Sequence, residues 1–331
     1  MKKIAIIGGG ASGLFAALHA AKEAKSDYHI EIFEGQDRVG KKLAITGSSM
    51  CNVTNNEPFE AMVKRYHDKE EPIRKVLSTF TVEETKKYFK SIHLPLVTRE
   101  DGKVFPASFR AKDVIQALVN ECKKYSIIIS TQMRIKAIQK ESDGFSLYCG
   151  EKILSSFDAV ILATGGFTFP NTGSKGDGYL LAQSMGHTIE PLRVGLSGTT
   201  IEDNALHQLS GLTLENVTIQ LPNRELRKGS LLITHEGLSG PVIINNSRYL
   251  PAKGELSLNY INVSCKEAQK KITSLCNENG SKMFVTILHS FNLPSSFIDY
   301  LIEKNGIDGR RKAAEIGKKS IIAIATSLTK D

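Results

Sequence analysis

The sequence predicts an α/β protein in which a domain with a parallel sheet is followed by a smaller, β-rich α+β domain. Residues 3–7, with the apolar run 4–7, predict a buried strand and residues 29–33 a second one, and apolar residues recur at helical spacing between Leu14 and Ala21. This order of strand, helix and strand favours a parallel sheet. Short strand-like runs become frequent after Pro191, which indicates the second domain.

The first domain continues with the same alternation of helices and strands. Apolar residues share one helical face from Thr85 to Ile92 and again from Ile115 to Cys122. Residues 55–72 are polar, and we expect them to be irregular. Strands are expected at residues 103–106, 127–129, 133–139, 145–149 and 159–163.

The second domain begins near residue 190. Strand-like runs occupy residues 217–221, 230–234 and 256–263, and helices return at Ala268 to Cys276 and Phe297 to Leu301. We therefore expect a first domain at residues 1–190 and a second at residues 191–331.

Composition excludes several classes of protein. No apolar stretch is long enough to span a bilayer and no signal segment is evident, so we expect a cytoplasmic protein without a membrane partner. The five cysteines are scattered and lack a C-x-x-C pair, which argues against a disulfide framework and a metal site. The net charge is +8, but the lysines are spread out, so we expect ordinary surface charge and no nucleic-acid partner.

A glycine-rich turn stands between the first strand and the first helix. Gly8, Gly10 and Gly13 have the spacing G-x-G-x-x-G, which allows a tight turn, a close approach of a pyrophosphate and close packing of helix on strand. The helix then begins with Ala11 and Ser12, whose N–H groups lie at the positive end of the helix dipole. We expect these five residues to hold a pyrophosphate.

An acidic residue completes the motif. Glu34 ends the second strand about 20 residues farther on, where a carboxylate can accept a hydrogen bond from a ribose hydroxyl. The alternative is a glycine-rich turn without a ligand, but the flanking strand, helix and acid favour a Rossmann-type dinucleotide-binding domain. The motif itself does not separate FAD from NAD.

Five further stretches carry a resemblance to a known family. In chain order they are residues 38–43 with 46–55 (RVGKKL, TGSSMCNVTN), 104–111 (VFPASFRA), 163–166 (ATGG), 170–179 (PNTGSKGDGY) and 234–241 (THEGLSGP). By these motifs, in this order across most of the chain, the sequence resembles the HI0933-like flavoproteins.

The resemblance implies a Rossmann-type FAD-binding domain, with the β-rich domain inserted late in it from about residue 191. It implies an FAD-dependent oxidoreductase that transfers a hydride between flavin and a small organic substrate. NAD(P)H or oxygen would be the second redox partner. Enone reduction of the ketosteroid type and aminoacetone oxidation are both family reactions, and the sequence selects neither, nor an oligomeric state.

The resemblance also assigns residues to the flavin. Cys51, Asn52 and Thr54 are expected to approach it, although a free cysteine is more often a small buried filler. The stretch 163–166 is expected to cross near the dinucleotide, or else to be a plain strand-to-loop turn. It comprises Ala163, Thr164, Gly165 and Gly166.

Four side chains have two interpretations each. Lys42 is either a phosphate ligand or a surface lysine. For catalysis, His235 of the second domain and Cys51 are the candidates, and a structural role is the alternative for both. Asp177 is expected to cap the helix that follows it, and a catalytic role is the alternative.

The chain departs from the family pattern at two places. Ser49 stands where a glycine is common. After the apolar run 321–328 the chain ends at Asp331, without the glycine-rich segment that returns to the Rossmann sheet in the family. The missing segment leaves open a truncated, inactive dinucleotide-binding protein. The basic charge together with the FAD motif leaves open an RNA-modifying flavoprotein.

Overall fold

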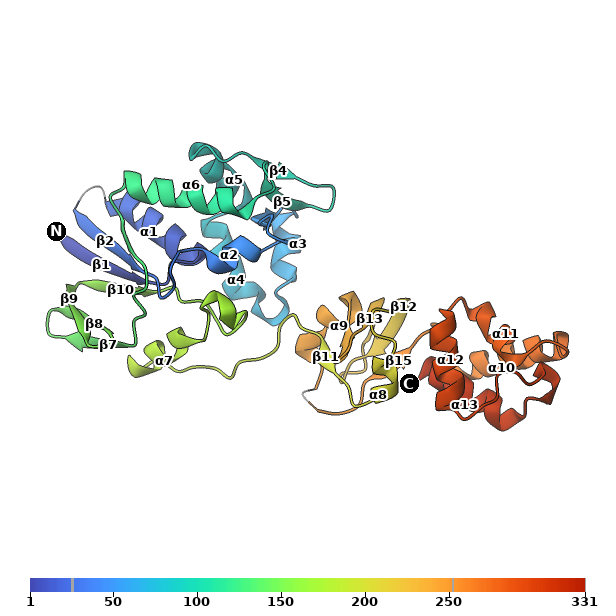
Figure 1. Ribbon diagram of the computed structural model, residues 1–331. Coiled ribbons are helices and arrows are strands. Elements are labelled where there is room, and N and C mark those ends of the chain that lie inside the picture. The colour runs from blue at the N-terminus through green and yellow to red at the C-terminus, as the bar shows by residue number, and fades with distance from the viewer. Residues whose placement is uncertain (25–26, 252, 331) are drawn as a thin grey trace. The chain divides into compact units, whose positions relative to one another are not determined.

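A computed structural model describes residues 1–24, 27–251 and 253–330. It contains two compact units, Met1–Glu190 and Pro191–Asp331, which are coloured blue to green and yellow to red in Figure 1. Each unit has its own hydrophobic core, so each is described by itself.

A parallel sheet forms the centre of unit 1, as predicted. All its neighbouring strands are parallel. Ile6 lies beside Ile32 on one neighbouring strand and beside Ile161 on the other. The strand order is β10 (Ala159–Leu162), β1 (Lys2–Ile7), β2 (Tyr28–Phe33) and β6 (Ile128–Ser130).

The two faces of this sheet are covered differently. Ile6 of β1 joins the core under α1 (Ala11–Ala24) and α6 (Ala111–Lys124). Its neighbours Ala5 and Ile7 join a second core under an antiparallel sheet, because successive side chains of a strand point to opposite faces. That sheet comprises β7 (Ala137–Glu141), β8 (Gly144–Cys149) and β9 (Lys152–Phe157). Figure 1 shows the helices on one side and β7–β9 on the other.

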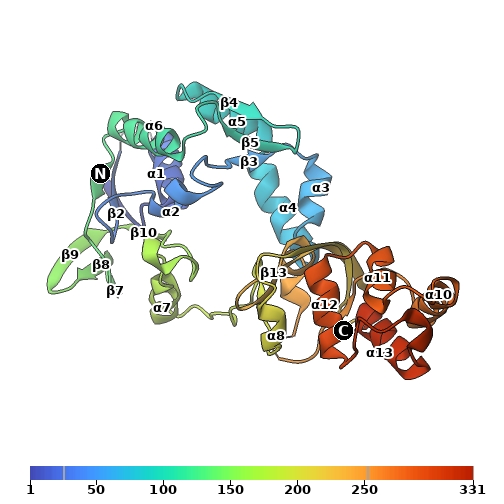
Figure 2. The ribbon, with the colours of Figure 1, turned by 45° about the vertical axis from the view of Figure 1, so that its right-hand side comes forward.

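The remaining elements of unit 1 surround this centre. A small antiparallel sheet has the order β3 (Thr54–Asn55), β5 (Lys103–Pro106), β4 (Leu96–Thr98). The helices are α2 (Lys41–Ile45), α3 (Phe59–Lys64), α4 (Glu70–Thr79), α5 (Val82–Ser91) and α7 (Asp177–Ser184). Figures 1 and 2 both place α3, α4 and the small sheet together, on the side of unit 1 away from β7–β9.

The expectation that residues 55–72 are irregular was wrong, because α3 and the start of α4 lie there. The six residues of α3 bury only Val63. A helix this short shows no full repeat of apolar residues, so periodicity could not reveal it. Glu60 of α3 is joined to Arg74 of α4 by hydrogen bonds of 2.5 and 2.9 Å.

Unit 2 combines a five-stranded antiparallel sheet with a group of helices over one continuous core. The strand order is β11 (Thr199–Thr200), β14 (Gly237–Ser239), β13 (Leu226–Ile233), β12 (Thr213–Gln220), β15 (Ser257–Asn259). The helices are α8 (Asn204–His207), α9 (Pro241–Ile244), α10 (Cys265–Glu278), α11 (Phe284–Leu288), α12 (Ser295–Lys304) and α13 (Lys318–Thr329). Within the described ranges, no helix is both long and apolar enough to cross a membrane. That unit 2 is an insertion stays a prediction.

Candidate cofactor site

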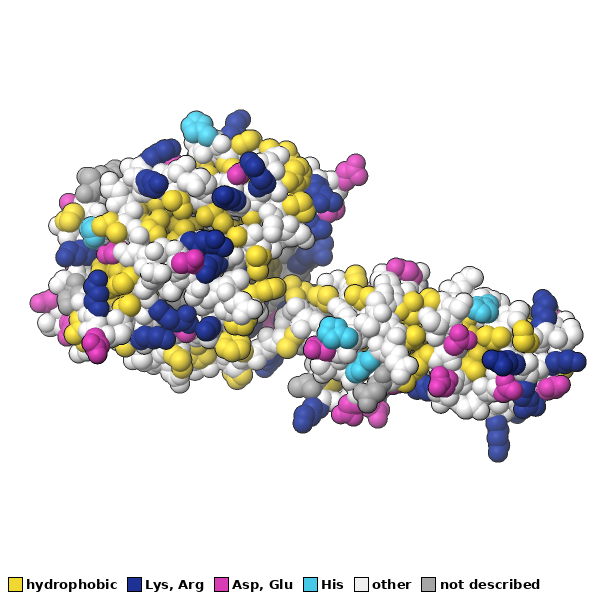
Figure 3. All heavy atoms as spheres, in the orientation of Figure 1, with side chains coloured by type: hydrophobic (Ala, Val, Ile, Leu, Met, Phe, Trp, Pro, Cys, Tyr) yellow, Lys and Arg dark blue, Asp and Glu magenta, His cyan; other side chains and the backbone are white. Residues whose placement is uncertain are grey.

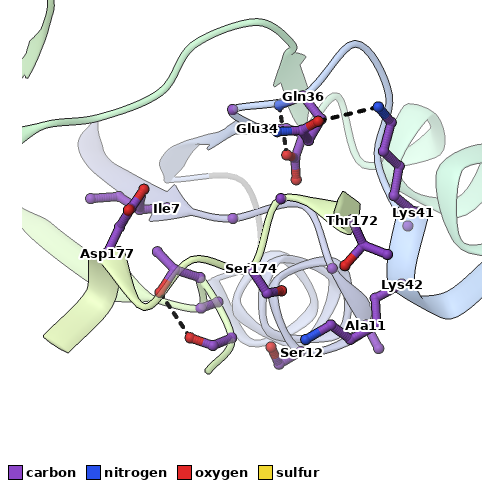
Figure 4. Close-up of a pocket in the computed structure, with 18 of the residues that line it drawn as sticks. Ile7, Ala11, Ser12, Glu34, Gln36, Lys41, Lys42, Thr172, Ser174 and Asp177 are labelled. Atoms are coloured by element: carbon purple, nitrogen blue, oxygen red, sulfur yellow. Dashed lines mark hydrogen bonds between the residues drawn. The ribbon is translucent and has the colours of Figure 1, made fainter. Parts of the chain in front are cut away.

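A pocket of about 340 Å³ opens in unit 1 where the parallel strands end. Ile7 and Phe33 are the last residues of β1 and β2, and Ala163 directly follows β10; all three line the pocket. Open parallel sheets bind ligands at this edge, and the volume is within the usual range for small-molecule pockets. Figure 4 shows the pocket and the side chains around it.

The three motif glycines have distinct structural roles. A Cβ atom at Gly8, whose φ is +109°, would lie 2.4 Å from the carbonyl oxygen of Ala163. A Cβ at Gly13 would lie 1.9 Å from the carbonyl oxygen of Gly8. At Gly10 it would meet no described atom within 4 Å. Gly8 and Gly13 therefore allow the turn to pack, whereas Gly10 leaves open backbone beside the pocket.

The N-terminus of α1 faces the same space. Ala11 and Ser12 line the pocket, and the first turn of α1 contains no acidic residue. The first N–H groups of a helix have no acceptor within the helix, and they carry its partial positive charge. This end of α1 can therefore bind a phosphate group.

The carboxylate of Glu34 is held by two backbone N–H groups. Gly9 N donates to Oε2 and Gln36 N donates to Oε1, each at 2.8 Å. Both oxygens keep lone pairs that can accept hydrogen bonds from a ribose. The structure thus shows how the orientation of Glu34 is fixed, and its role as a ribose ligand stays a prediction.

Two lysines of α2 line the pocket. Lys41 Nζ donates to Gln36 Oε1 at 3.2 Å and lies 2.5 Å from a carboxylate oxygen of Asp37. Lys42 Nζ donates to Thr168 Oγ1 at 3.3 Å, and burial lowers the pKa of Lys42 below its ordinary value. Lys42 is thus a lining residue whose role as a phosphate ligand stays a prediction.

An ion pair lies at another wall of the pocket. Arg134 Nη2 is 2.6 Å from Asp177 Oδ2, and both side chains are partly buried. The expectation that Asp177 caps α7 was wrong. Asp177 is the first helical residue and makes no capping hydrogen bond. Gly176 occupies the capping position with φ +79°, whereas a capping side chain requires an extended backbone.

The Cys51 region lies beside the pocket, not in its wall. Cys51 is 1% exposed, and burial raises the pKa of its thiol. A buried, protonated thiol fits the structural interpretation of Cys51. The side-chain amide nitrogen of Asn52, oriented toward carbonyl groups, lies 2.8 Å from Thr54 O. Thr54 itself pairs with Val104 in the small sheet.

The loop that leads to Cys51 has an unusual backbone. Gly47, Ser48, Ser49 and Cys51 all have positive φ, between 54° and 68°. Ser49, the position where the family has a glycine, therefore adopts a conformation that favours glycine. Side chains in such conformations cost of order 1 kcal/mol each and concentrate at functional sites.

The two other groups of predicted residues lie as follows. Ala163, Thr164 and Gly165 line the pocket, whereas Gly166 does not. His235 lies in unit 2 in the turn between β13 and β14. Its side chain is 83% exposed and 4.0 Å from Glu236. A catalytic role for His235 remains a prediction.

Sequence reasoning missed several lining residues, which come from loops after parallel strands. Gln36 and Lys41 follow β2, Arg134 follows β6, and Thr172 and Ser174 follow β10. The rule that ligands meet the carboxyl ends of parallel strands would have indicated all three loops.

Comparison with known proteins identifies the family. The model of the HI0933-like protein Rossmann domain matches residues 2–272, so the chain belongs to that family. A 3-dehydro-bile acid delta(4,6)-reductase of Clostridium scindens is 34% identical over 77% of this chain and 61% of its own length. A ribosomal RNA dihydrouridine synthase of Haemophilus influenzae is 27% identical over 95% of this chain and 77% of its own length. A solved flavocytochrome c3 fumarate reductase has 14% identity over 65% of this chain and 47% of its own, with a TM-score of 0.45. The chain therefore spans less than two thirds of the length of the bile-acid reductase.

FAD is the cofactor of this family, and the pocket fits it. The open backbone at Gly10 suits the close approach of a pyrophosphate, and the helix end beside it supplies unpaired N–H groups. The Glu34 carboxylate retains acceptors for a ribose. The described lining contains no side chain that fills the space above Gly10.

Proposed function

We propose that the protein is an FAD-dependent oxidoreductase that adds a hydride to a carbon–carbon double bond conjugated with a carbonyl group. The observation that carries the proposal is the fixed Glu34 carboxylate beside the open glycine turn, in a member of this family. The bound flavin would supply the hydride transfer.

The names of two relatives support the reaction class. One is a delta(4,6)-reductase of a 3-dehydro-bile acid, and the other makes dihydrouridine in ribosomal RNA. Both names describe saturation of a ring double bond that is conjugated with a carbonyl. The shared chemistry favours reduction of a conjugated double bond over oxidation of an amine.

The chain's own residues would bind and orient the cofactor. The N-terminus of α1 and the backbone of Gly8 to Gly10 would hold the pyrophosphate, with Lys42 as a further cation. Glu34 would hold the adenosine ribose. The electron donor proposed for this reduction is NADH or NADPH, and oxygen is the alternative acceptor.

A second candidate substrate is uracil within ribosomal RNA. The synthase of Haemophilus influenzae matches 95% of this chain, a larger share than the bile-acid reductase matches. The prediction of no nucleic-acid partner is thus not confirmed. Figure 3 shows lysine and arginine side chains distributed over the visible face of both units, between acidic and apolar ones. We place RNA second because the basic side chains on that face form no continuous stripe that could bind an RNA backbone.

The test begins with the visible absorption spectrum of the full chain, before and after incubation with excess FAD and desalting. We expect a retained oxidised-flavin spectrum. Anaerobic NADH or NADPH should bleach it, and a conjugated enone should restore it faster than buffer alone. A colourless protein that FAD cannot reconstitute would contradict the proposal and favour the inactive alternative. If oxygen restores the oxidised-flavin spectrum but the enone does not, the reductase reaction is contradicted.

A further inference from the structure

The loop between β10 and α7, residues 165–176, extends across the cofactor pocket. In the parallel sheet β1 lies between β10 and β2, yet this loop contacts residues that follow β2. Thr168 Oγ1 accepts a 3.3 Å hydrogen bond from Lys42 of α2, and a Cβ at Gly173 would lie 2.8 Å from Cγ of Gln36. The loop therefore passes over the end of β1, where the glycine turn begins. We call residues 165–176 the strap.

The backbone of the strap is less firmly attached than the other loops of the pocket. Within the described part of the chain, residues 165–175 form backbone hydrogen bonds only with one another. By contrast, Gly40 N donates to Gly9 O at 2.9 Å, which joins the loop after β2 to the glycine turn. Gln132 N donates to Gln36 O at 2.8 Å, which joins the loops after β6 and β2. Segments that lack such bonds open at a low cost in free energy, so the strap is the wall most able to move.

The side chains and the ends of the strap also permit movement. Phe167 and Phe169 are each 64% exposed, so their burial stabilises the closed position little. Gly165 and Gly176, at the two ends, have φ values of +75° and +79°. Glycine adopts such conformations without strain, and small residues at the ends of a loop often act as its hinges. The strap can therefore move between two glycines.

Ser174 gives the closed strap a group that can bind the cofactor. It lines the pocket and is only 9% exposed, and Figure 4 shows it there with Thr172 of the same strap. Its hydroxyl forms no hydrogen bond with another described residue, and a buried hydroxyl without a partner is unfavourable. A ligand that accepts this hydrogen bond binds the closed strap more tightly than the open one, which is the condition for closure upon binding.

We propose that the strap opens to admit FAD and closes over the bound dinucleotide. The hydrogen bond from Lys42 to Thr168 is the latch of the closed strap. Ser174 donates a hydrogen bond to the cofactor after the strap has closed. The proposal concerns entry and release of the cofactor, so it does not depend on which substrate the flavin reduces.

Stopped-flow fluorescence of the full chain tests the latch through the rates of FAD association and dissociation. Thr168→Val removes the acceptor of the latch, so both rate constants should rise about threefold and the Kd should change little. Ser174→Ala should raise only the dissociation rate constant, about fivefold, because its hydrogen bond forms after closure. Thr98→Val is the matched control, since Thr98 is exposed on β4 and does not line the pocket. It should leave both rate constants unchanged.

Proteolysis of the wild-type chain tests the movement without any substitution. Chymotrypsin cleaves after exposed aromatic residues, and saturating FAD should slow its cleavage after Phe167 about tenfold or more, because the open strap becomes rare. Cleavage after Tyr66, which is 43% exposed and does not line the pocket, should keep its rate. Mass spectrometry of the fragments gives both rates.

Unchanged cleavage after Phe167 in the presence of FAD would overturn the strap. A higher Kd of Thr168→Val without faster association would also overturn it, because that result indicates a merely structural contact. Faster FAD exchange in Thr168→Val together with protection of Phe167, but with no enone reduced, would support the strap and contradict the proposed reaction. Enone reduction with FAD exchange equal in Thr168→Val and Thr98→Val would overturn the latch and leave the proposed reaction standing.

Discussion

Arg134 and Asp177 form an ion pair of 2.6 Å that joins the loop after β6 to the first turn of α7 at the wall of the cofactor pocket. Arg134 also packs against the turn after β2, where a Cβ at Gly35 would lie 3.3 Å from its own Cβ. One side chain thus fixes segments that follow three different parallel strands. Asp177 also balances its charge, so that Arg134 organises the pocket without adding a free cation.

Removal of Arg134 should weaken FAD binding more than removal of its partner. Arg134→Gln leaves Asp177 and Glu34 as two carboxylates beside the anionic pyrophosphate, and we expect the FAD Kd to rise about tenfold, or about 1.4 kcal/mol. Asp177→Asn should have a smaller effect, and the double variant should recover part of the loss. Titration of flavin fluorescence measures the FAD Kd of each variant.

The control is Arg110→Gln, which breaks a 3.1 Å ion pair with Asp113 on α6 away from the pocket. It should leave the FAD Kd unchanged. Equal effects of Arg134→Gln and Arg110→Gln would show that the Arg134–Asp177 pair has no part in cofactor binding.

Gly10→Ala and Gly13→Ala should fail in opposite ways. A Cβ at Gly10 meets no described atom within 4 Å, so the Tm of Gly10→Ala should lie within about two degrees of the wild-type Tm. It should nevertheless retain little FAD, because the methyl group occupies the approach of the pyrophosphate. At Gly13 the Cβ would lie 1.9 Å from Gly8 O, so this variant should lose several kcal/mol of stability. Thermal unfolding without FAD measures the loss of stability, and the flavin spectrum measures the loss of FAD. If Gly10→Ala retains as much FAD as wild type, the role assigned to Gly10 in pyrophosphate binding is refuted.

The parallel sheet was predictable because each of its strands has a local signature. β1 and β10 contain apolar runs, β2 has apolar residues at Ile30, Ile32 and Phe33, and a glycine turn and an amphipathic helix separate β1 from β2. The α3 and α4 region was not predictable in this way, since α3 buries a single residue and an ion pair joins it to α4. Such contacts leave no periodic pattern in a sequence.

The site was predictable only where one motif places its residues. Glu34 and the glycine turn lie within one βαβ unit, so spacing alone brings them together. Arg134 and Asp177 are 43 positions apart and meet only because β6 and β10 belong to one sheet.

Tyr88 offers a test of stability apart from function. Its hydroxyl is buried and has no hydrogen-bond partner among the described residues, and burial raises its pKa. Tyr88→Phe removes an unsatisfied polar group, so the free energy of unfolding should stay equal or rise by about 1 kcal/mol. Tyr125→Phe, at a residue 43% exposed, should be neutral. Urea denaturation measures both, and a loss above about 1 kcal/mol for Tyr88→Phe would mean that the hydroxyl is hydrogen-bonded in solution.

Alkylation should distinguish Cys265 from the cysteine of the family motif. Burial alone would raise the pKa of Cys265, but hydrogen bonds with Thr326 and Gln269 outweigh it and the net pKa is lowered. Cys51 has a raised pKa because of burial. At any pH below the ordinary thiol pKa, Cys265 therefore has the larger thiolate fraction, and the thiolate is the nucleophile.

At pH 8 iodoacetamide should label Cys265 at least about tenfold faster than Cys51, by the difference in thiolate fraction and exposure. Labelling of Cys265 should rise with pH and reach half its maximal rate at a pH below the ordinary thiol pKa. Peptide mapping by mass spectrometry gives both rates, and Cys265→Ser should remove only the fast phase. Slow labelling of Cys51 would support its interpretation as a buried residue that packs within the loop of positive φ values. Labelling of Cys51 as fast as Cys265 would mean that the loop opens in solution, and a redox role for Cys51 would then have to be reconsidered.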